Sequence, residues 1–458
     1  MCGIIGITGH KEAARLTYLG LYALQHRGEE SAGIVSYDRK NMHSHQGMGL
    51  VADIFDEAAI SSLRGDIAVG HVRYSTTGSS LQQNIQPFLV HHKRGSIAIA
   101  HNGNFTNTSI LRERLEESGS IFQTTMDSEI IVHLLAQSRQ KDYKQRVIDA
   151  LSPLEGAYSL VMLLDDVLVG ARDPRGFRPL CLGKFNGSYI LASETCALDL
   201  IQAQYVRDIE PGEIVFITKQ GISSVKPFPK CRHAFCIFEY IYFARPDSNI
   251  FGENVYLTRK RLGEQLAKES PAKCDLVMPI PDSGSYAAMG FAHESGMPQE
   301  IGMIRNHYVG RTFIQPSQFI RDFRVKVKLN PIKDAIRGKR LAVVEDSIVR
   351  GTTSKARVKT LYESGAKAVH MRISCPPITC PCFYGIDFPT KKELIAANRS
   401  VDEVKKFMGL DSLKYLSLKG MLSSMSQPAC EFCTACFNGD YPTKTPRYFS
   451  KTMLEKRG

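Results

Sequence analysis

The chain has 458 residues, enough for two or three globular domains, each with a core of its own. Hydrophobic residues make up 43% and charged residues 23%, as in ordinary soluble proteins, and no apolar run approaches the roughly 18 residues of a membrane span. The first residues lack the cationic start and long apolar region of a secretory signal, so we expect a cytoplasmic protein. The formal net charge of +12 comes without a helix-turn-helix pattern or an aromatic-interleaved basic stripe, which favours an anionic small-molecule substrate over nucleic acid.

The first half of the chain mixes helical and strand patterns without strict alternation. Helical periodicity covers three stretches, 12–24, 108–118 and 127–138. Strands or hairpins are predicted at 65–74, 95–101, 157–171 and 212–225, the third range turning at Asp165-Asp166. This mixture predicts an α+β domain built from layered antiparallel sheets.

A change of rhythm follows the Pro-containing segment 226–230, which we expect to be a linker. Beyond it, helices are predicted at 255–269, 285–294 and 353–364. Strands are predicted at 275–280, 300–305, 340–344 and 368–374. Alternation of this kind is typical of a parallel sheet with crossover helices. We therefore expect two domains, 2–230 and 231–458, of which the second is of the α/β class.

A cysteine at position 2 becomes the amino terminus once the initiator methionine is removed. Its α-amine, which titrates near neutrality, is then available as the general base for its own thiol. Taken alone, Cys2 is more simply a small apolar residue at the start of a strand. A catalytic interpretation depends on the motifs that follow it.

Four motifs follow Cys2 in order. They are Gln25-His26-Arg27-Gly28, His71-Val72-Arg73-Tyr74-Ser75-Thr76, His101-Asn102-Gly103-Asn104 and Thr125-Met126-Asp127-Ser128-Glu129. The series resembles the N-terminal-nucleophile (class II) glutamine amidotransferases, over roughly residues 2–230. The resemblance implies that Cys2 attacks the side-chain amide of glutamine. It also implies that Arg73 binds the substrate α-carboxylate and Asp127 the α-ammonium. Asn102 and the Gly103 N–H would form the oxyanion hole.

These roles suit the residue types. A guanidinium fork matches a carboxylate, a carboxylate matches an ammonium, and the tetrahedral intermediate needs donors aimed at its oxyanion. Each residue also has an ordinary interpretation: Arg73 as a surface ion pair, Asn102-Gly103 as a turn, and Asp127 as a helix N-cap. The ordered occurrence of all the motifs favours the catalytic interpretation.

Residues 341–354 run from an apolar strand through two acids into a Gly/Thr-rich turn and a helix. Small residues let backbone N–H groups close on a phosphate, and a helix N-terminus adds positive potential. Glu345 and Asp346 suit ribose hydroxyls and hydrated Mg²⁺. The string resembles the phosphoribosyl pyrophosphate (PRPP) loop of the type I phosphoribosyltransferases, although Glu345 stands where that family usually has Asp. The resemblance implies PRPP binding by Ser347, Arg350, Gly351, Thr352 and Thr353.

A second loop, Pro279-Ile280-Pro281-Asp282-Ser283-Gly284, resembles the pyrophosphate loop of the same family, with Ser283 near the metal. Between the two loops, a cationic segment runs from Tyr308 to Asn330. It resembles the flexible lid of the PRPP amidotransferases, which implies that Arg311 and Lys328 contact the PRPP phosphates and that closure excludes water.

Both halves together resemble the PRPP amidotransferases over nearly the whole chain, and the string 238–248 at the junction adds to the likeness. The family implies transfer of glutamine-derived ammonia to carbon 1 of PRPP, the first step of purine nucleotide synthesis. It also implies a homotetramer that purine nucleotides inhibit, with Tyr240 or Tyr242 near an ammonia channel.

Six of the twelve cysteines lie in the last third of the chain, and clustering of this kind in a reducing compartment points to metal. Four thiolates can hold either Zn²⁺ or a [4Fe–4S] cluster, and spacing alone does not distinguish them. Local contexts resemble the iron–sulfur branch of the PRPP amidotransferases, which implies a [4Fe–4S] cluster held by Cys236, Cys382, Cys433 and Cys436. Three further cysteines are alternative ligands or buried free thiols: Cys375, Cys380 and Cys430.

Three other classes of protein share part of this pattern. Another class II amidotransferase, such as a sugar-phosphate aminator or asparagine synthetase, would lack residues 345–354. A salvage phosphoribosyltransferase would lack the Cys2 domain. A purine-sensing regulator built on a phosphoribosyltransferase fold would have no use for Cys2 with Arg73 and Asp127. The presence of both sets of residues argues against all three.

Overall fold

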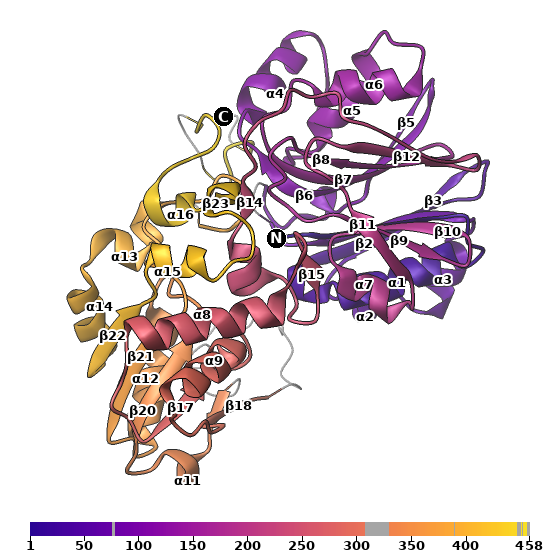
Figure 1. The fold of residues 1–458 in the computed structure, drawn as a ribbon. Helices are drawn as coiled ribbons and strands as arrows, with labels where there is room; N and C mark the ends of the chain where they lie inside the picture. Colours follow the sequence, from indigo (N-terminus) through magenta and orange to yellow (C-terminus); the bar gives the residue numbers. More distant parts are fainter. Residues whose placement is uncertain (76–77, 307–328, 389, 447–449, 451, 456–458) are drawn as a thin grey trace.

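The computed structural model describes residues 1–458 except 76–77, 307–328, 389, 447–449, 451 and 456–458. Figure 1 shows two bodies joined near the amino terminus: the first half of the chain, from indigo to magenta, and the second half, from pink to yellow. Among the described residues, none of the helices combines the length and the apolar character that a bilayer span requires.

Two antiparallel sheets form the first body. The seven-stranded sheet has the order β11-β9-β10-β1-β4-β2-β3. Its strands are β1 (Gly3–Thr8), β2 (Ser31–Tyr37), β3 (Met42–Met48), β4 (Ile67–Arg73), β9 (Cys181–Phe185), β10 (Ser188–Ala192) and β11 (Gln204–Asp208). The six-stranded sheet has the order β13-β12-β8-β7-β6-β5. Its strands are β5 (Phe88–His92), β6 (Gly95–Phe105), β7 (Gly156–Leu164), β8 (Val167–Arg172), β12 (Ile214–Thr218) and β13 (Gly221–Val225).

Helices cover the outer faces of the two sheets, so that the body has four layers (Figure 1). Apolar side chains of the facing strands, such as Val69 and Val161, form the core between the sheets. Outside the first sheet lie α1 (Ala13–Ala23), α2 (Val51–Ile54), α3 (Glu57–Ser62) and α7 (Thr195–Leu200). Outside the second lie α4 (Thr108–Glu117), α5 (Glu129–Gln137) and α6 (Tyr143–Leu151). The layered antiparallel arrangement predicted from the sequence is confirmed.

A parallel sheet of order β17-β20-β21-β22 organises the second body, which confirms the α/β prediction. Its strands are β17 (Leu276–Pro279), β20 (Arg340–Glu345), β21 (Ala368–Ile373) and β22 (Ser412–Tyr415). The longer helices are α8 (Val255–Glu269), α9 (Ser285–Ser295), α12 (Thr352–Glu363) and α14 (Val401–Met408). The short ones are α11 (Lys333–Ile336), α13 (Ile395–Asn398), α15 (Leu418–Ser423) and α16 (Ala435–Asn438). The side chains of β20, Leu341 to Val344, are fully buried, as expected for a central parallel strand.

One predicted strand of the parallel sheet is wrong. The range 300–305 contains only β18 (Met303–Arg305), which pairs antiparallel with β19 (Leu329–Pro331) in a separate two-stranded sheet. Ile301 and Ile304 are 62% and 51% exposed, whereas Met303 is buried, so this short strand packs by one side only.

The two bodies meet around short elements after residue 226. Strand β14 (Phe235–Cys236) pairs in parallel with β23 (Phe432–Cys433), and β15 (Asn249–Ile250) pairs with β16 (Glu253–Asn254). A π-helix, η3 (Glu239–Phe243), leads from β14 toward α8. The core cluster of the second body also includes Met1, Ala157 and Phe177, so apolar packing continues across the junction. Short 3-10 turns complete the fold: η1 (Gln25–Arg27), η2 (Gln82–Asn84), η4 (Lys391–Glu393) and η5 (Ala429–Glu431).

Candidate active sites and cysteine cavity

Cys2 directly precedes β1 and lies beside the end of β4. Gly3 pairs with Val72, which brings Cys2 next to Arg73, the last residue of β4. The Cys2 N–H donates to Asn102 Oδ1 at 3.3 Å, and its Sγ lies 3.7 Å from the carbonyl oxygen of Tyr74. Gly28 lets the turn after α1 approach this strand end, because a Cβ there would lie 2.5 Å from the Arg73 carbonyl carbon. The predicted nucleophile and the predicted carboxylate-binding arginine are therefore neighbours.

Asn102 is held inside a strand and points an unused donor into the protein. It belongs to β6, where it pairs with Ser159 while Gly103 pairs with Tyr158, and it is fully buried. Its Oδ1 accepts from Cys2, whereas its Nδ2 finds no hydrogen-bond partner among the described residues. An unsatisfied buried amide N–H is costly, so it calls for an explanation. An oxyanion beside Cys2 would satisfy it.

Arg73 and Asp127 are both buried close to this strand end. Arg73 is 3% exposed and donates to the carbonyl oxygens of Gly78 and Ser79 at 3.2 Å. Burial lowers the pKa of its guanidinium, which an anionic substrate group would offset. Asp127 Oδ2 accepts from the Phe105 N–H at 3.0 Å, and its Oδ1 lies 3.5 Å from His101 Nδ1. One buried cation, which also pairs with Glu30 at 3.7 Å, and one buried anion thus lie near Cys2.

The ordinary interpretations of these residues are wrong. Arg73 is not a surface residue. Asn102 and Gly103 are not a turn, because both pair within the β6–β7 ladder. Asp127 does not cap α5, since the N-cap is Ser128 and the Asp127 carboxylate contacts β6 instead.

The second candidate site lies where β20 ends. Asp346, 5% exposed, accepts hydrogen bonds from the hydroxyls of Ser283 and Ser347. Glu345 accepts from Ser354 Oγ at 3.1 Å and pairs with Arg357. Burial, together with the adjacent Asp346 carboxylate, raises the pKa of Glu345 to about 7, and burial also raises that of Asp346. Two buried neighbouring carboxylates at a strand end form a site that a cation would stabilise.

The loop that carries Ser283 packs against the end of β20. The Ile280 N–H donates to the Val344 carbonyl at 2.9 Å, and a Cβ at Gly284 would lie 2.4 Å from the same oxygen. This close approach places Ser283 against Asp346, so the two predicted loops converge.

The predicted PRPP-binding residues surround the start of α12. Gly351 is buried and has a φ of 74°, a conformation that suits glycine. Thr352, Thr353 and Arg350 are exposed, and Ser347 is half-buried. Arg350 pairs with Glu393 on the surface. Exposed hydroxyls and backbone at a helix N-terminus are accessible to a phosphate.

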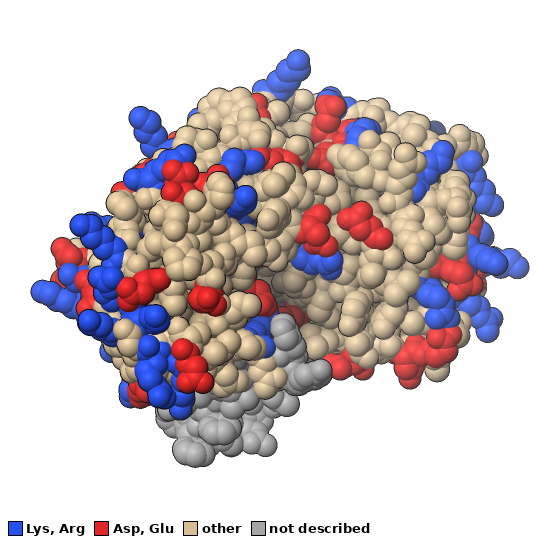
Figure 2. All heavy atoms as spheres, turned by 60° about the horizontal axis from the view of Figure 1, so that its bottom comes forward, with Lys and Arg blue, Asp and Glu red and all other residues tan. Residues whose placement is uncertain are grey.

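Arg311 and Lys328 lie outside the described residues. Figure 2 shows Lys and Arg side chains gathered over the left-hand side of the molecule, which the second half of the chain forms, and a hollow near the centre of this face with charged side chains at its rim. The sequence agrees with this view, because residues 231–458 contain 35 Lys and Arg against 22 Asp and Glu, whereas residues 1–230 contain 23 against 24.

All four predicted cluster ligands line one cavity. Its lining consists of Phe177, Cys236, Phe238, Cys382, Tyr384, Ile386, Cys433, Ala435 and Cys436. The β14–β23 pairing aligns Cys236 with Cys433, and the N–H groups of Thr379 and Cys380 donate to the Cys436 carbonyl at 3.0 Å. Burial raises the pKa of the Cys236 thiol to about 11 and raises those of Cys433 and Cys436 as well. The alternatives Cys375, Cys380 and Cys430 do not line this cavity.

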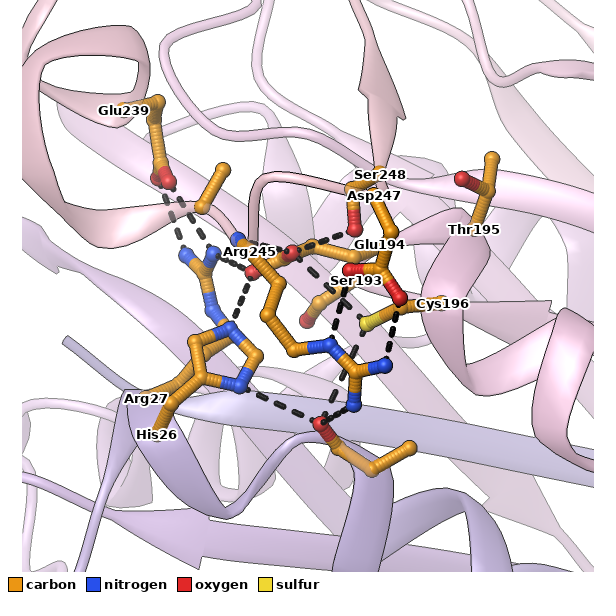
Figure 3. A network of polar contacts seen from close by, with 12 residues as sticks. His26, Arg27, Ser193, Glu194, Thr195, Cys196, Glu239, Arg245, Asp247 and Ser248 are labelled. Atoms are coloured by element: carbon orange, nitrogen blue, oxygen red, sulfur yellow. Dashed lines mark hydrogen bonds and ion pairs between the residues drawn. The ribbon is translucent and has the colours of Figure 1, made fainter. Parts of the chain in front are cut away.

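A network of buried charges beside Cys2 was not predicted. Arg27 and Glu239 belong to two of the motifs that carry the family resemblance, but the motifs alone do not indicate a role for either residue. Figure 3 shows Arg27 between Glu239 and Glu194, with His26 also directed at Glu194. A second contact joins β6 to the segment next to Cys382: Asn104 Nδ2 donates to the Phe383 carbonyl at 2.9 Å.

Comparison with known proteins identifies relatives along nearly the whole chain. A family model described as "Glutamine amidotransferase domain" matches residues 71–200. Amidophosphoribosyltransferase 1, chloroplastic, from Arabidopsis thaliana is 52% identical over 97% of this chain and 79% of that protein. Amidophosphoribosyltransferase from Bacillus subtilis is 46% identical over 97% of this chain and 94% of that protein.

A solved structure has the same architecture. The glutamine PRPP amidotransferase from B. subtilis, complexed with ADP and GMP, superimposes with a TM-score of 0.93 at 45% identity, over 98% of this chain and 99% of that chain. Its agreement covers both bodies, so the first has the fold of an N-terminal-nucleophile glutamine amidotransferase and the second that of a type I phosphoribosyltransferase. With about half of its residues identical over nearly the full length, the chain belongs to the amidophosphoribosyltransferase family.

Proposed function

We propose that this chain transfers ammonia from glutamine to carbon 1 of PRPP, giving 5-phosphoribosylamine, glutamate and pyrophosphate, as the first step of purine nucleotide synthesis. The observation that supports this most strongly is the presence in one chain of two separate sites: the unused Asn102 donor beside Cys2, and the paired carboxylates at Asp346. Residues 2–230 form the glutaminase domain and residues 231–458 the phosphoribosyltransferase domain.

In the first domain, Cys2 becomes the nucleophile after removal of Met1. Its α-amine accepts the thiol proton, and the thiolate attacks the side-chain carbonyl of glutamine. Asn102 Nδ2 and the Gly103 N–H donate to the resulting oxyanion. The proton passes to the leaving nitrogen, ammonia departs, and water hydrolyses the glutamyl thioester to glutamate. Arg73 and Asp127 hold the α-carboxylate and α-ammonium of the substrate.

In the second domain, the turn before α12 binds PRPP through Ser347, Arg350, Gly351, Thr352 and Thr353. Arg311 and Lys328 contact its phosphates. Ammonia attacks carbon 1 of the ribose, and the bond to pyrophosphate breaks. Asp346 and Ser283 would hold Mg²⁺ together with Glu345, whose carboxylate already pairs with Arg357. The ion would supply positive charge beside the pyrophosphate oxygens. Oxygen ligands in a buried anionic pair suit such a hard cation.

The cysteine cavity holds a [4Fe–4S] cluster through Cys236, Cys382, Cys433 and Cys436. Four thiolates around one Zn²⁺ at about 2.3 Å would be closely packed. Among the described residues, no three His, Cys, Asp or Glu side chains stand together closely enough to hold a single ion. The four cysteines line one cavity, and their sequence contexts resemble the iron–sulfur branch of the family, which favours the cluster over Zn²⁺. The cluster ties β14, β23 and the segment around Cys382 together, so its role is structural.

Purine nucleotides act as feedback inhibitors. The B. subtilis structure, with its ADP and GMP, supports this proposal. The protein works as a cytoplasmic homotetramer and requires neither nucleic acid nor membrane.

Measurement of glutamate and pyrophosphate release tests the proposed function. Pyrophosphate should form from PRPP with either glutamine or ammonium as the nitrogen donor, and glutamate release should rise when PRPP is added. Asp346→Asn should weaken pyrophosphate release with both donors. If it impaired only the glutamine reaction, the two sites would be wrongly divided.

A further inference from the structure

Arg27 connects the backbone of Cys2 to two carboxylates from distant parts of the chain. Its Nε donates to the Cys2 carbonyl at 2.8 Å. Its Nη1 and Nη2 donate to the two oxygens of Glu239 at 3.0 and 2.9 Å, and Nη1 also contacts Glu194. Glu194 and Glu239 are 167 and 212 residues away in sequence. Four donor contacts thus fix one guanidinium.

The network is buried and its charges balance. The side chains of Arg27, Glu194 and Glu239 are fully buried, as is that of Arg178, which pairs with Glu239 at 3.3 Å. Two guanidinium groups therefore face two carboxylates. Transfer of such groups out of water is expensive, and apolar residues of similar volume often give equal or greater stability. Stability alone does not account for ions at this place, and their geometry has to be considered.

The effect of this geometry is to fix the main chain of Cys2. The Cys2 N–H is bonded to Asn102 Oδ1 and the Cys2 carbonyl to Arg27 Nε, so both backbone polar atoms are held. Burial, and to a smaller degree the nearby Arg178 and Arg27, lowers the pKa of the Met1 amine to about 5. Arg27 would remain close to the α-amine of Cys2 once Met1 is removed, because it donates to the Cys2 carbonyl. Arg27 therefore constrains both the position and the surroundings of the amino terminus.

Glu239 belongs to the junction between the two bodies. It is the first residue of η3, and the guanidinium of Arg259 in α8 donates to the carbonyls of Tyr240 and Ala244 at 2.7 and 2.8 Å. The position of Glu239 is thus set by a helix of the phosphoribosyltransferase body.

We propose that Arg27 is a positioning residue for the Cys2 nucleophile, and that Glu239 holds Arg27 in place, so that glutamine hydrolysis depends on the placement of η3. The inference rests on the proposed role of Cys2. Arg27 does not touch glutamine, so it affects the chemical step through Cys2 and leaves substrate binding by Arg73 and Asp127 in place.

Arg27→Lys tests the proposal. Lysine keeps the charge, but a single ammonium does not reproduce a fork that contacts Cys2 and both carboxylates together. A displaced nucleophile should lower kcat with glutamine by about 10²-fold, while KM for glutamine stays close to that of the parent chain. Synthesis from ammonium and PRPP should be retained. Glu239→Gln, which keeps the side-chain shape, should act in the same direction.

Arg207→Lys is the matched control. Arg207 also binds a buried glutamate through two nitrogens, at 2.8 and 2.7 Å from Glu213, in the same body but without contact to Cys2. Its glutamine-dependent kcat should be unchanged. Parent-like kcat in both Arg27→Lys and Glu239→Gln, or a rise in KM without a fall in kcat, would overturn the proposal. Loss of ammonium-dependent synthesis in both variants would overturn it as well, because the network would then be purely structural. Cys2→Ala separates the two hypotheses: glutamine use that survives in this variant refutes the proposed nucleophile itself.

Discussion

The oxyanion site makes an unusual prediction, because its main side-chain donor is unsatisfied in the absence of substrate. Replacing Asn102 with leucine, which has a similar size, removes the unpaired Nδ2 and the acceptor for the Cys2 N–H. An unsatisfied buried donor costs about 1–3 kcal/mol, and the lost hydrogen bond contributed about 0.5–1.5 kcal/mol. Leucine also leaves the Cys2 N–H without its acceptor, which offsets this gain, so the free energy of unfolding should change by no more than about 1 kcal/mol.

The glutamine-dependent activity, in contrast, should fall sharply. Loss of one oxyanion donor lowers kcat by about 10²–10³-fold, or about 2.7–4 kcal/mol of transition-state stabilisation. Thermal unfolding, glutamate release and ammonium-dependent synthesis measured on Asn102→Leu would separate these effects. We expect a Tm close to that of the parent chain, a severe loss of glutamine use, and parent-like use of ammonium. Near-normal glutamate release would refute the role of Asn102. A large fall in Tm would show that its amide is a structural group.

Three further predictions concern other parts of the molecule. Burial lowers the pKa of His71 in the folded protein to about 3, whereas a histidine in the unfolded chain titrates at about 6.5. The stability that depends on neutral His71 is therefore fully present above pH 6.5 and is lost as the pH falls. Between pH 6.5 and 5 this loss amounts to about 2 kcal/mol, and urea unfolding of His71→Gln should show a correspondingly smaller decline. Gly385→Ala should lower both Tm and glutamine use, because its Cβ would lie 3.0 Å from the Gly103 carbonyl oxygen. Gly119→Ala has a similar positive φ but open space around the Cβ, so it controls for backbone strain. Equal effects in the two variants would contradict a role for the contact with Gly103. Cys236→Ser should lose iron on anaerobic purification whereas Cys430→Ser should keep it, and the reverse pattern would replace the proposed ligand set.

Strongly periodic elements of this fold could be predicted from the sequence. Helix α8 has the predicted bounds, and the 157–171 hairpin turns at Asp165-Asp166 between β7 and β8 as expected. Both have local patterns that tertiary packing does not overrule. The strand predicted at 300–305 is not part of the parallel sheet, because a short strand pattern does not specify its partner, and β18 pairs with β19 instead.

Contacts between residues far apart in the sequence limited how much of the two sites could be predicted. The ordered motifs, through the family resemblance that they carry, predicted that Cys2, Arg73 and Asn102 share one site, and the structure brings the three together. The role of Arg27 could not be predicted, because its partners lie far along the chain and an Arg or Glu alone does not reveal its partner. The β14–β23 pairing that aligns Cys236 with Cys433 involves two-residue strands, too short for any periodic pattern to appear.

The central claim is that Cys2 supplies ammonia to a second site that can also use ammonium from solution. Cys2→Ala, assayed for pyrophosphate release from PRPP with each nitrogen donor, tests it most directly. We predict that this variant loses glutamine-dependent synthesis while ammonium-dependent synthesis remains close to that of the parent chain. Retained glutamine use, or loss of both reactions in a folded protein, would contradict the account.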